Sequence, residues 1–332
     1  MVTTAIRIAA VASVVACRFA ADDCATITAH AGETVTCSVP GYVDRAFDLR
    51  LPPSWDGVSA LPVILALHGG AANRAAADSV TCPDADTTKP ECLGTQAVAR
   101  GYALLSPDGV GSRPERGIRT WNAGGGVNGF ICAFGPACFQ NVDDVKYIAD
   151  VFDQVAGVIT VDPARIYSTG ISNGGAMSHR LACQDRRFAA IAPVSGPNVY
   201  ADSGAGPCNV RVPILDIHGT EDPVLNYNGD DISTQGVLSS VEQTMEAWRV
   251  RNGCAATFVD TPLPDRDPDD GTTSTLREWD NCVVTTKHIR VEGGGHTWPS
   301  GDQFGWETFI GRVNRDFGSE VILDFFDAHP HD

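Results

Sequence analysis

Positive charge is scarce in this chain of 332 residues. Lys and Arg number 24 against 41 Asp and Glu, which gives a formal net charge of −17. Nucleic-acid binding needs a basic face that displaces counterions from phosphates, so this balance argues against a nucleic-acid partner. Hydrophobic residues make up 43% and charged residues 20% of the chain, an ordinary globular composition that excludes global disorder.

Long hydrophobic runs are missing beyond the first residues, so no later segment predicts a membrane span. The start of the chain is typical of an export signal, because Arg7 precedes a run of apolar and small residues at positions 8–16. We therefore predict a signal peptide over residues 1–23 and a secreted, extracytoplasmic protein. Two interpretations of its cleavage stay open: an ordinary cleaved signal, or a bacterial lipobox that ends at Cys17 and leaves a lipid anchor there.

The sequence also lacks C-x-x-C pairs, which argues against a zinc site, although it contains 11 cysteines. Without Cys17 an even set remains, and an even set in an exported chain indicates disulfides. The sequence does not fix their connectivity. The preferred hypothesis pairs sequence neighbours, so that each bond closes one local loop: Cys24 with Cys37, Cys82 with Cys92, Cys132 with Cys138, Cys183 with Cys208, and Cys254 with Cys282.

Short apolar runs alternate with helical patterns along most of the chain. Residues 63–67 form a continuous apolar run of the kind found in a buried central strand. Other strands are predicted at 33–37, 45–51, 102–106, 165–169, 189–194, 214–217 and 288–291, and helices at 142–155, 175–183, 237–251 and 307–328. This alternation predicts one α/β domain over residues 24–332, with a mostly parallel central sheet flanked by helices and disulfide-stapled loops.

Two irregular regions interrupt the alternation. Residues 113–140 are rich in glycine and cysteine, and we predict a substrate-facing loop there. Residues 260–273 are acidic and contain proline, which favours a solvated excursion.

The pattern G-x-S-x-G occupies residues 170–174, between a predicted strand and a predicted helix. In this context the serine sits on a sharp turn that lifts its hydroxyl above the sheet, and flanking glycines avoid collisions with neighbouring backbone. We therefore predict Ser172 as a nucleophile.

A serine nucleophile requires a base and an acid that orients the base, and this motif supplies them in the order serine, acid, histidine. His296 follows the strand 288–291 on a glycine-rich loop and is the predicted base. Asp222 lies just past the strand 214–217 and is the predicted acid, with Glu221 as its nearest alternative. The remaining downstream histidines fit less well, since they lie at strand ends or in the C-terminal tail: His218, His288, His329 and His331.

The oxyanion of the reaction needs two backbone N–H donors. We predict one from Asn173, which follows the nucleophile, and the other from Gly70, with Ala71 as the alternative. Two tryptophans of glycine-rich loops, Trp121 and Trp298, are either substrate contacts or local packing anchors.

Several separated motifs occur in a fixed order: LALHGG, SPDG, WNAGGG, NVDDVKYI, RIYSTGISNGGAM, IHGTEDPV, GGGHTWP and DFFDAHP. Together they resemble the polyhydroxybutyrate depolymerase and feruloyl esterase family of secreted α/β-hydrolases. The resemblance implies a serine triad without metal or organic cofactor, with the nucleophile at Ser172, the acid at Asp222 and the base at His296. It also implies hydroxycinnamoyl, acetyl or hydroxyalkanoate esters as substrates.

Four functions follow as hypotheses. The preferred one is a feruloyl-esterase-like enzyme that releases hydroxycinnamates from plant cell-wall polysaccharide. A polyhydroxybutyrate or other polyester depolymerase and an acetyl xylan esterase would use the same triad. A non-catalytic cell-wall-binding lipoprotein is the alternative outside the enzyme class, because fold does not imply function.

Overall fold

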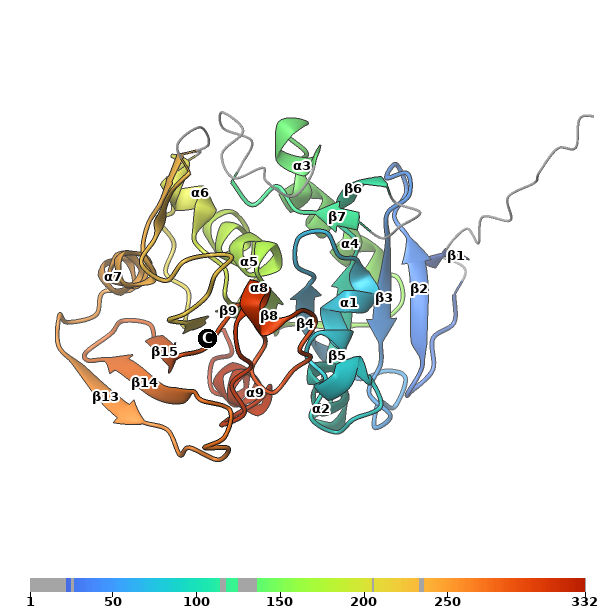
Figure 1. Cartoon of the computed structure of the whole chain (residues 1–332). Helices are drawn as coiled ribbons and strands as arrows, with labels where there is room; N and C mark the ends of the chain where they lie inside the picture. Colours follow the sequence, from blue (N-terminus) through green and yellow to red (C-terminus); the bar gives the residue numbers. More distant parts are fainter. Residues whose placement is uncertain are drawn as a thin grey trace, which may run out of the picture.

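The computed structural model describes residues 22–24, 27–113, 118–124, 136–204, 206–232 and 236–331. An 11-stranded sheet with the strand order β1-β2-β3-β5-β4-β8-β9-β10-β15-β14-β13 crosses the molecule (Figure 1). The strands from β5 to β15 in this order run parallel, whereas β3 and β14 pair with them in the antiparallel sense. The predicted mostly parallel sheet is therefore confirmed.

The strands of this sheet are β1 (Asp22–Asp23), β2 (Thr34–Ser38), β3 (Ala46–Arg50), β4 (Leu61–Leu67), β5 (Ala103–Pro107), β8 (Val161–Ile171), β9 (Ala190–Val194), β10 (Ile214–Gly219), β13 (Phe258–Pro262), β14 (Thr273–Trp279) and β15 (Thr286–Glu292). Two hairpins lie outside it, β6 (Val110–Arg113) with β7 (Ile118–Thr120), and β11 (Asp230–Ile232) with β12 (Gly236–Leu238). The helices are α1 (Arg74–Ser79), α2 (Leu93–Ala99), α3 (Pro136–Phe139), α4 (Asp144–Ala156), α5 (Asn173–Gln184), α6 (Val199–Asp202), α7 (Val241–Arg251), α8 (Glu307–Ile310) and α9 (Glu320–Asp327).

Side chains of the fully buried strand β4 alternate between two hydrophobic cores, one on each face of the sheet. Val63 and Leu65 join the core that contains residues of α4, α5 and α7. Ile64 and Ala66 join the core that contains residues of α1, α2 and α9. Helices thus cover both faces, which explains why the central strands are apolar throughout instead of alternating (Figure 1).

The predicted helix over 307–328 is wrong, because the segment is divided into α8 and α9. Gly311 ends α8 with a φ of 78°, a conformation that favours glycine, and a Cβ at this position would lie 2.4 Å from the Cα of Gly295. The intervening chain packs against the loop before His296, since the Gly295 N–H donates to the Arg312 carbonyl over 2.9 Å.

Two other boundaries differ from the sequence prediction. The helix expected from residue 237 begins at Val241, after a capping box in which the Ser240 side chain accepts from the Gln243 N–H. The solvated excursion expected at 260–273 contains the end of β13 and the start of β14, which extend the sheet as an antiparallel hairpin. Strand β13 was not predicted because Phe258–Pro262 has no alternation of apolar and polar residues, in keeping with its exposure along its whole length.

Four of the five predicted disulfides are formed: Cys24–Cys37, Cys82–Cys92, Cys183–Cys208 and Cys254–Cys282. Cys132 and Cys17 lie outside the described residues. Strand β1 pairs with β2 at Asp22 and Asp23, so the folded part of the chain includes the last two residues of the predicted signal peptide, residues 1–23. Within the described ranges, no helix is long and apolar enough to span a membrane.

Candidate active site

Ser172 occupies a strained turn between β8 and α5. Its φ of 59° and ψ of −123° lie outside the helical and extended regions, which is the conformation that the G-x-S-x-G motif requires. A Cβ on Gly170 or Gly174 would lie 2.5 or 2.2 Å from the Leu67 carbonyl oxygen. The two glycines therefore let the turn approach the end of β4.

His296 lies on the loop that follows β15 and is buried. Its Nδ1 makes a hydrogen bond of 2.7 Å with Oδ2 of Asp222, which leaves Nε2 as the free ring nitrogen. Ser172 and His296 line the same cavity, but no hydrogen bond joins their side chains. Catalytic hydrogen bonds are often long before substrate binds, so this geometry fits a base that completes its contact in the substrate complex.

Asp222 is fixed by four hydrogen-bond contacts in the turn after β10. Its Oδ1 accepts from the N–H groups of Val224 and Leu225, each over 2.8 Å. Its Oδ2 faces two histidines, His296 at 2.7 Å and His218 at 3.3 Å. Burial by itself raises the pKa of Asp222, but the hydrogen bonds from His218 and His296 outweigh it and hold the pKa well below its usual range. The alternative acid, Glu221, is exposed.

His218 is a member of this site that the sequence did not reveal. Besides Asp222, its Nε2 lies 2.9 Å from the Leu225 carbonyl, and its ring is buried. Burial lowers the pKa of His218, but hydrogen bonding to Asp222 and the charges of Asp222 and Asp216 reverse this, so the net pKa is raised. The only signal in the sequence was its position four residues before the acid, across a tight turn.

The opposite side of the site contains the predicted oxyanion donors. Gly70 and Ala71 both line the cavity with Ser172, and Asn173 is the first residue of α5. The Asn173 side chain accepts from the Trp121 N–H over 2.6 Å and donates to the Trp121 carbonyl over 3.0 Å. This reciprocal pair ties the start of α5 to the segment around Trp121.

His68 organises the turn after β4. Its Nδ1 lies 2.7 Å from the Gly69 carbonyl and its Nε2 accepts from the Gly109 N–H over 2.9 Å, which assigns the proton to Nδ1. Burial lowers the pKa of His68 to about 4, so the ring is neutral at physiological pH. The Trp121 indole N–H donates to the His68 carbonyl over 3.0 Å.

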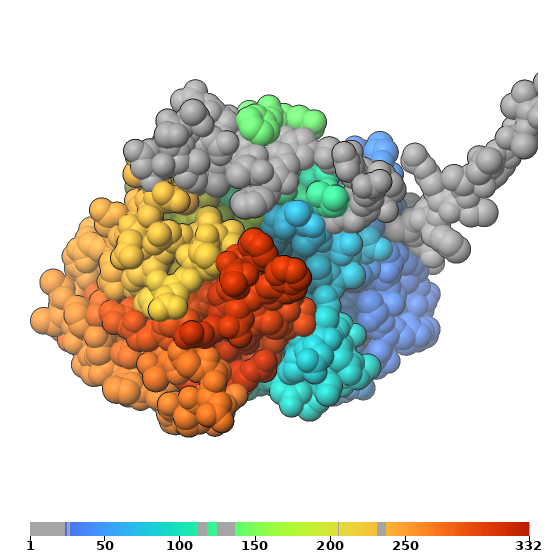
Figure 2. Space-filling view, in the orientation of Figure 1, coloured from blue at the N-terminus to red at the C-terminus, as the bar shows by residue number. Residues whose placement is uncertain are grey.

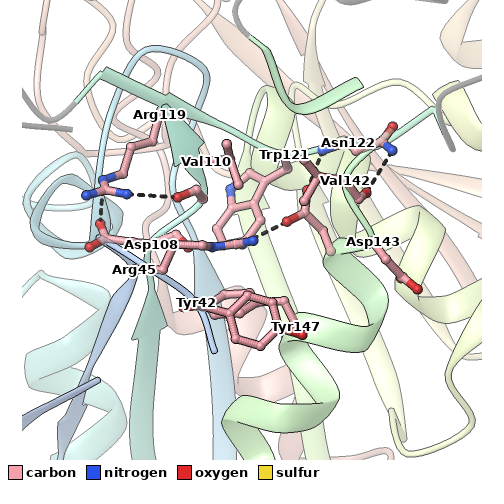
Figure 3. A network of polar contacts seen from close by, with 12 residues as sticks. Tyr42, Arg45, Asp108, Val110, Arg119, Trp121, Asn122, Val142, Asp143 and Tyr147 are labelled. Carbon is pink, nitrogen blue, oxygen red and sulfur yellow. Dashed lines mark hydrogen bonds and ion pairs between the residues drawn. The ribbon is translucent and has the colours of Figure 1, made fainter. Parts of the chain in front are cut away.

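A buried ion pair supports the same region (Figure 3). Arg45 contacts Oδ1 of Asp144 over 2.7 Å, and Oδ2 of Asp144 accepts from the Asn122 N–H over 2.7 Å. The Arg45 guanidinium also lies 3.3 Å from the ring centroid of Tyr147. The Trp121–Asn122 backbone, and through it Asn173, is therefore held by a charge pair that is hydrogen-bonded on both sides.

Trp121 and Trp298 do not line the cavity, and each is only 1% exposed. The Trp298 indole N–H donates to the Ser319 hydroxyl over 3.1 Å. Of the two roles predicted for these tryptophans, packing anchor fits their contacts and substrate contact does not.

The cavity beside Ser172 has a volume of about 370 Å³ and a mainly apolar wall. Apart from Ser172 and His296, it is lined by Gly69, Gly70, Ala71, Ala72, Ala76, Ser79, Val80, Ile171, Val224, Asp302, Phe304 and Ile310. Asp302 is the only carboxylate in this set, and burial and the nearby charge of Asp84 raise its pKa. Among the described residues, no group of three or more His, Cys, Asp or Glu side chains is arranged to hold a metal ion.

No family model matches the chain. Among known proteins, it is 27% identical over 272 residues to feruloyl esterase C of Emericella nidulans, an alignment that covers 81% of this chain and 82% of that protein. It is 29% identical over 212 residues to a bifunctional acetylxylan esterase/xylanase of Neocallimastix patriciarum, covering 63% of this chain. The chain spans only about a quarter, 26%, of that second relative.

The structure resembles the acetyl xylan esterase from Aspergillus awamori, with a TM-score of 0.51 at 14% identity over 85% of this chain and 94% of that one. This likeness concerns the fold, and it confirms the predicted α/β-hydrolase architecture. The sequence relatives confirm the predicted resemblance to feruloyl esterases. The chain is therefore an α/β-hydrolase of the carboxylic ester hydrolase class.

Proposed function

We propose that this protein hydrolyses hydroxycinnamoyl or related esters of plant cell-wall polysaccharide through a Ser172–His296–Asp222 triad. The main support is the hydrogen bond between His296 and Asp222 beside a serine on a strained turn, with all three on loops at the carboxyl ends of parallel strands. The names of the relatives, feruloyl esterase and acetylxylan esterase, support this class of substrate.

In the proposed mechanism, Nε2 of His296 accepts the proton of the Ser172 hydroxyl as the oxygen attacks the ester carbonyl. The N–H groups of Gly70 and Asn173 donate to the oxyanion of the tetrahedral intermediate. The intermediate collapses to an acyl-serine as the protonated His296 gives its proton to the departing alcohol. A water molecule, deprotonated by His296, then attacks the acyl-serine and releases the acid.

The cavity favours a large acyl group. A volume of about 370 Å³ with a mainly apolar lining exceeds what an acetyl group fills, so a hydroxycinnamoyl group fits it better. Asp302 offers a hydrogen-bond acceptor in this mainly apolar wall, which suits a phenolic hydroxyl.

The disulfides support an extracytoplasmic location, because such bonds persist in oxidising compartments. A signal peptide and a lipid anchor at Cys17 remain predictions from the sequence, since residues 1–21 lie outside the described part of the chain.

The test compares the purified protein with its Ser172→Ala variant on p-nitrophenyl acetate, p-nitrophenyl butyrate, methyl ferulate and hydroxybutyrate oligomers. We expect methyl ferulate to be the best substrate, with a loss of about 10⁴-fold or more in kcat in the variant. Preference for acetate would indicate an acetyl esterase, and preference for the oligomers a polyester depolymerase. Turnover that does not depend on Ser172 would reject the triad.

A further inference from the structure

Three aromatic side chains stand exposed within six residues of a segment that contributes Phe304 and Ile310 to the cavity beside Ser172. Phe304 is 47% exposed, Trp306 is 77% exposed and Phe309 is 66% exposed. The only other exposed phenylalanines or tryptophans in the described ranges are Phe139 and Phe258. Clustered exposure of this kind marks an interaction surface more often than chance, whereas single exposed apolar residues need no explanation.

This segment is attached directly to the loop of the proposed base. The Ile310 carbonyl accepts the backbone N–H of His296, and both Ile310 and Phe304 line the cavity. Trp306 lies two residues after the cavity-lining Phe304, and Phe309 directly precedes the cavity-lining Ile310, so both rings belong to the segment that forms this part of the wall. In Figure 2 the red segment that contains α8 lies at the surface between the cyan and yellow parts of the chain.

Trp306 and Phe309 contact each other without covering each other. Their ring centroids lie 5.9 Å apart with an interplanar angle of 34°, and both rings keep most of their surface exposed. The charged residues that flank the two rings in the sequence are Asp302, Glu307 and Arg312, within a chain of net charge −17. This surface therefore suits a neutral partner and disfavours an acidic polymer.

We propose that Trp306 and Phe309 form a platform on which the neutral sugar chain of an esterified polysaccharide stacks while its acyl group occupies the cavity. The inference rests on the proposed function and extends it from the acyl group to the polymer that carries it. A sugar ring presents apolar C–H groups on its face and hydroxyls at its edge, so it can stack on an aromatic ring while its hydroxyls remain hydrated. A small ester ends inside the cavity and would not reach the platform.

The experiment compares the double variant Trp306→Ala/Phe309→Ala with the wild type and with Phe258→Ala, a control at an exposed aromatic residue of β13. Each is assayed on feruloylated arabinoxylan and on methyl ferulate. We expect kcat/KM on the polymer to fall about tenfold in the double variant, mainly through KM, and the rate on methyl ferulate to change less than about twofold. Phe258→Ala should match the wild type on both substrates.

A binding measurement separates the platform from catalysis. The same substitutions are placed in the Ser172→Ala background, and depletion of each protein by insoluble xylan and by polyhydroxybutyrate granules is measured. Loss of xylan binding in the double variant alone would support the proposal. Unchanged xylan binding in the double variant would overturn the proposal, and so would an equal fall in the rates on the polymer and on methyl ferulate. If the two rings were needed for binding to polyhydroxybutyrate but not to xylan, the partner would be a polyester and the sugar-chain proposal would be wrong.

These outcomes are distinct from failure of the proposed function. If no ester were hydrolysed in a Ser172-dependent manner, the enzyme proposal would fall, while xylan depletion would still report whether the two aromatic rings bind a sugar chain.

Discussion

Two buried histidines follow β4 and end β10, strands that lie on either side of β8 and β9 in the sheet, and the pKa values of these histidines move in opposite directions. His68, beyond β4, contacts only backbone groups through its ring nitrogens, and burial lowers its pKa to about 4. His218, at the end of β10, is equally buried, but the carboxylate of Asp222 raises its pKa. Burial alone therefore does not decide the charge of a histidine here, since the partner decides it.

The contrast extends to how each side is built. The side of the proposed nucleophile, Ser172, depends on close backbone approach, with Gly170 and Gly174 set against the Leu67 carbonyl. The acid side depends on hydrogen bonds that converge on the single carboxylate of Asp222. A substitution that adds side-chain volume should therefore damage the region around Ser172, and a substitution that removes a charge should damage the region around Asp222.

The largest expected effect comes from Asp222→Asn. The amide nitrogen would donate to Nδ1 of His296 and favour the tautomer with its proton on Nε2, and the neutral amide cannot stabilise the protonated ring, so we expect kcat on methyl ferulate to fall by up to about 10⁴-fold. Initial rates measure the loss, and thermal unfolding checks that the variant is folded. The control is Glu221→Gln, an exposed neighbour that should retain the wild-type rate. A nearly unchanged rate in Asp222→Asn would remove Asp222 from the triad.

Gly174→Ala tests the steric side. Its new Cβ would lie 2.2 Å from the Leu67 carbonyl oxygen, which forces backbone to move, so we expect a loss of about 3 kcal/mol in the free energy of unfolding together with most of the activity. Gly157→Ala is the matched control, because its nearest contact is 3.2 Å and its φ is −76°. Denaturant unfolding compares the two, and equal stabilities would contradict the close approach.

The lowered pKa of His68 predicts a stability that depends on pH. The unfolded chain binds a proton at His68 below pH about 6.5, whereas the folded chain resists it until about pH 4, so stability falls as the pH drops through this window. The contribution of this residue is up to about 3 kcal/mol. His68→Gln should flatten the dependence of the unfolding free energy on pH between 6.5 and 4, and an unchanged slope would mean that folding does not lower the pKa of His68.

His218→Gln should have the smallest effect on the reaction and the opposite dependence on pH. We expect about a tenfold lower kcat, because Asp222 loses one of the contacts that position it. A raised folded pKa contributes stability that is complete below pH about 6.5 and is lost as the pH rises through the folded pKa. The stability difference from wild type should therefore be larger at pH 6 than at pH 9, and the reverse order would show that Asp222 does not hold the proton on His218.

The sequence predicted the parts of the fold that depend on local patterns. Fully apolar runs located the central strands. The G-x-S-x-G motif located the turn at Ser172, because the close backbone contacts at this turn leave no room for a side chain at either glycine. The hydrogen bond between His296 and Asp222 was anticipated from chain order, because loops at the carboxyl ends of parallel strands meet at one edge.

Features that depend on tertiary packing were missed. Trp121 and Trp298 were singled out by their glycine-rich loops, yet both are buried, whereas the exposed Trp306 directly precedes the segment 307–328 that was interpreted as one helix. No periodicity distinguishes these cases, because burial of an indole depends on what other segments cover it. His218 was set aside for its place at a strand end, and only the fold brings its ring to Asp222.

The described disulfides also determine what a proteolytic cut would release. Each joins cysteines 10 to 28 residues apart, so the cross-links form short closed rings. A cut between β13 and β14 falls inside the Cys254–Cys282 ring, and both fragments would stay covalently joined. A cut near the exposed Gly57 falls between rings, where no described disulfide bridges it, and strands β2 and β3 would then remain attached only by non-covalent contacts: the hydrogen bonds of the sheet, the packing of the core and the Arg45–Asp144 ion pair.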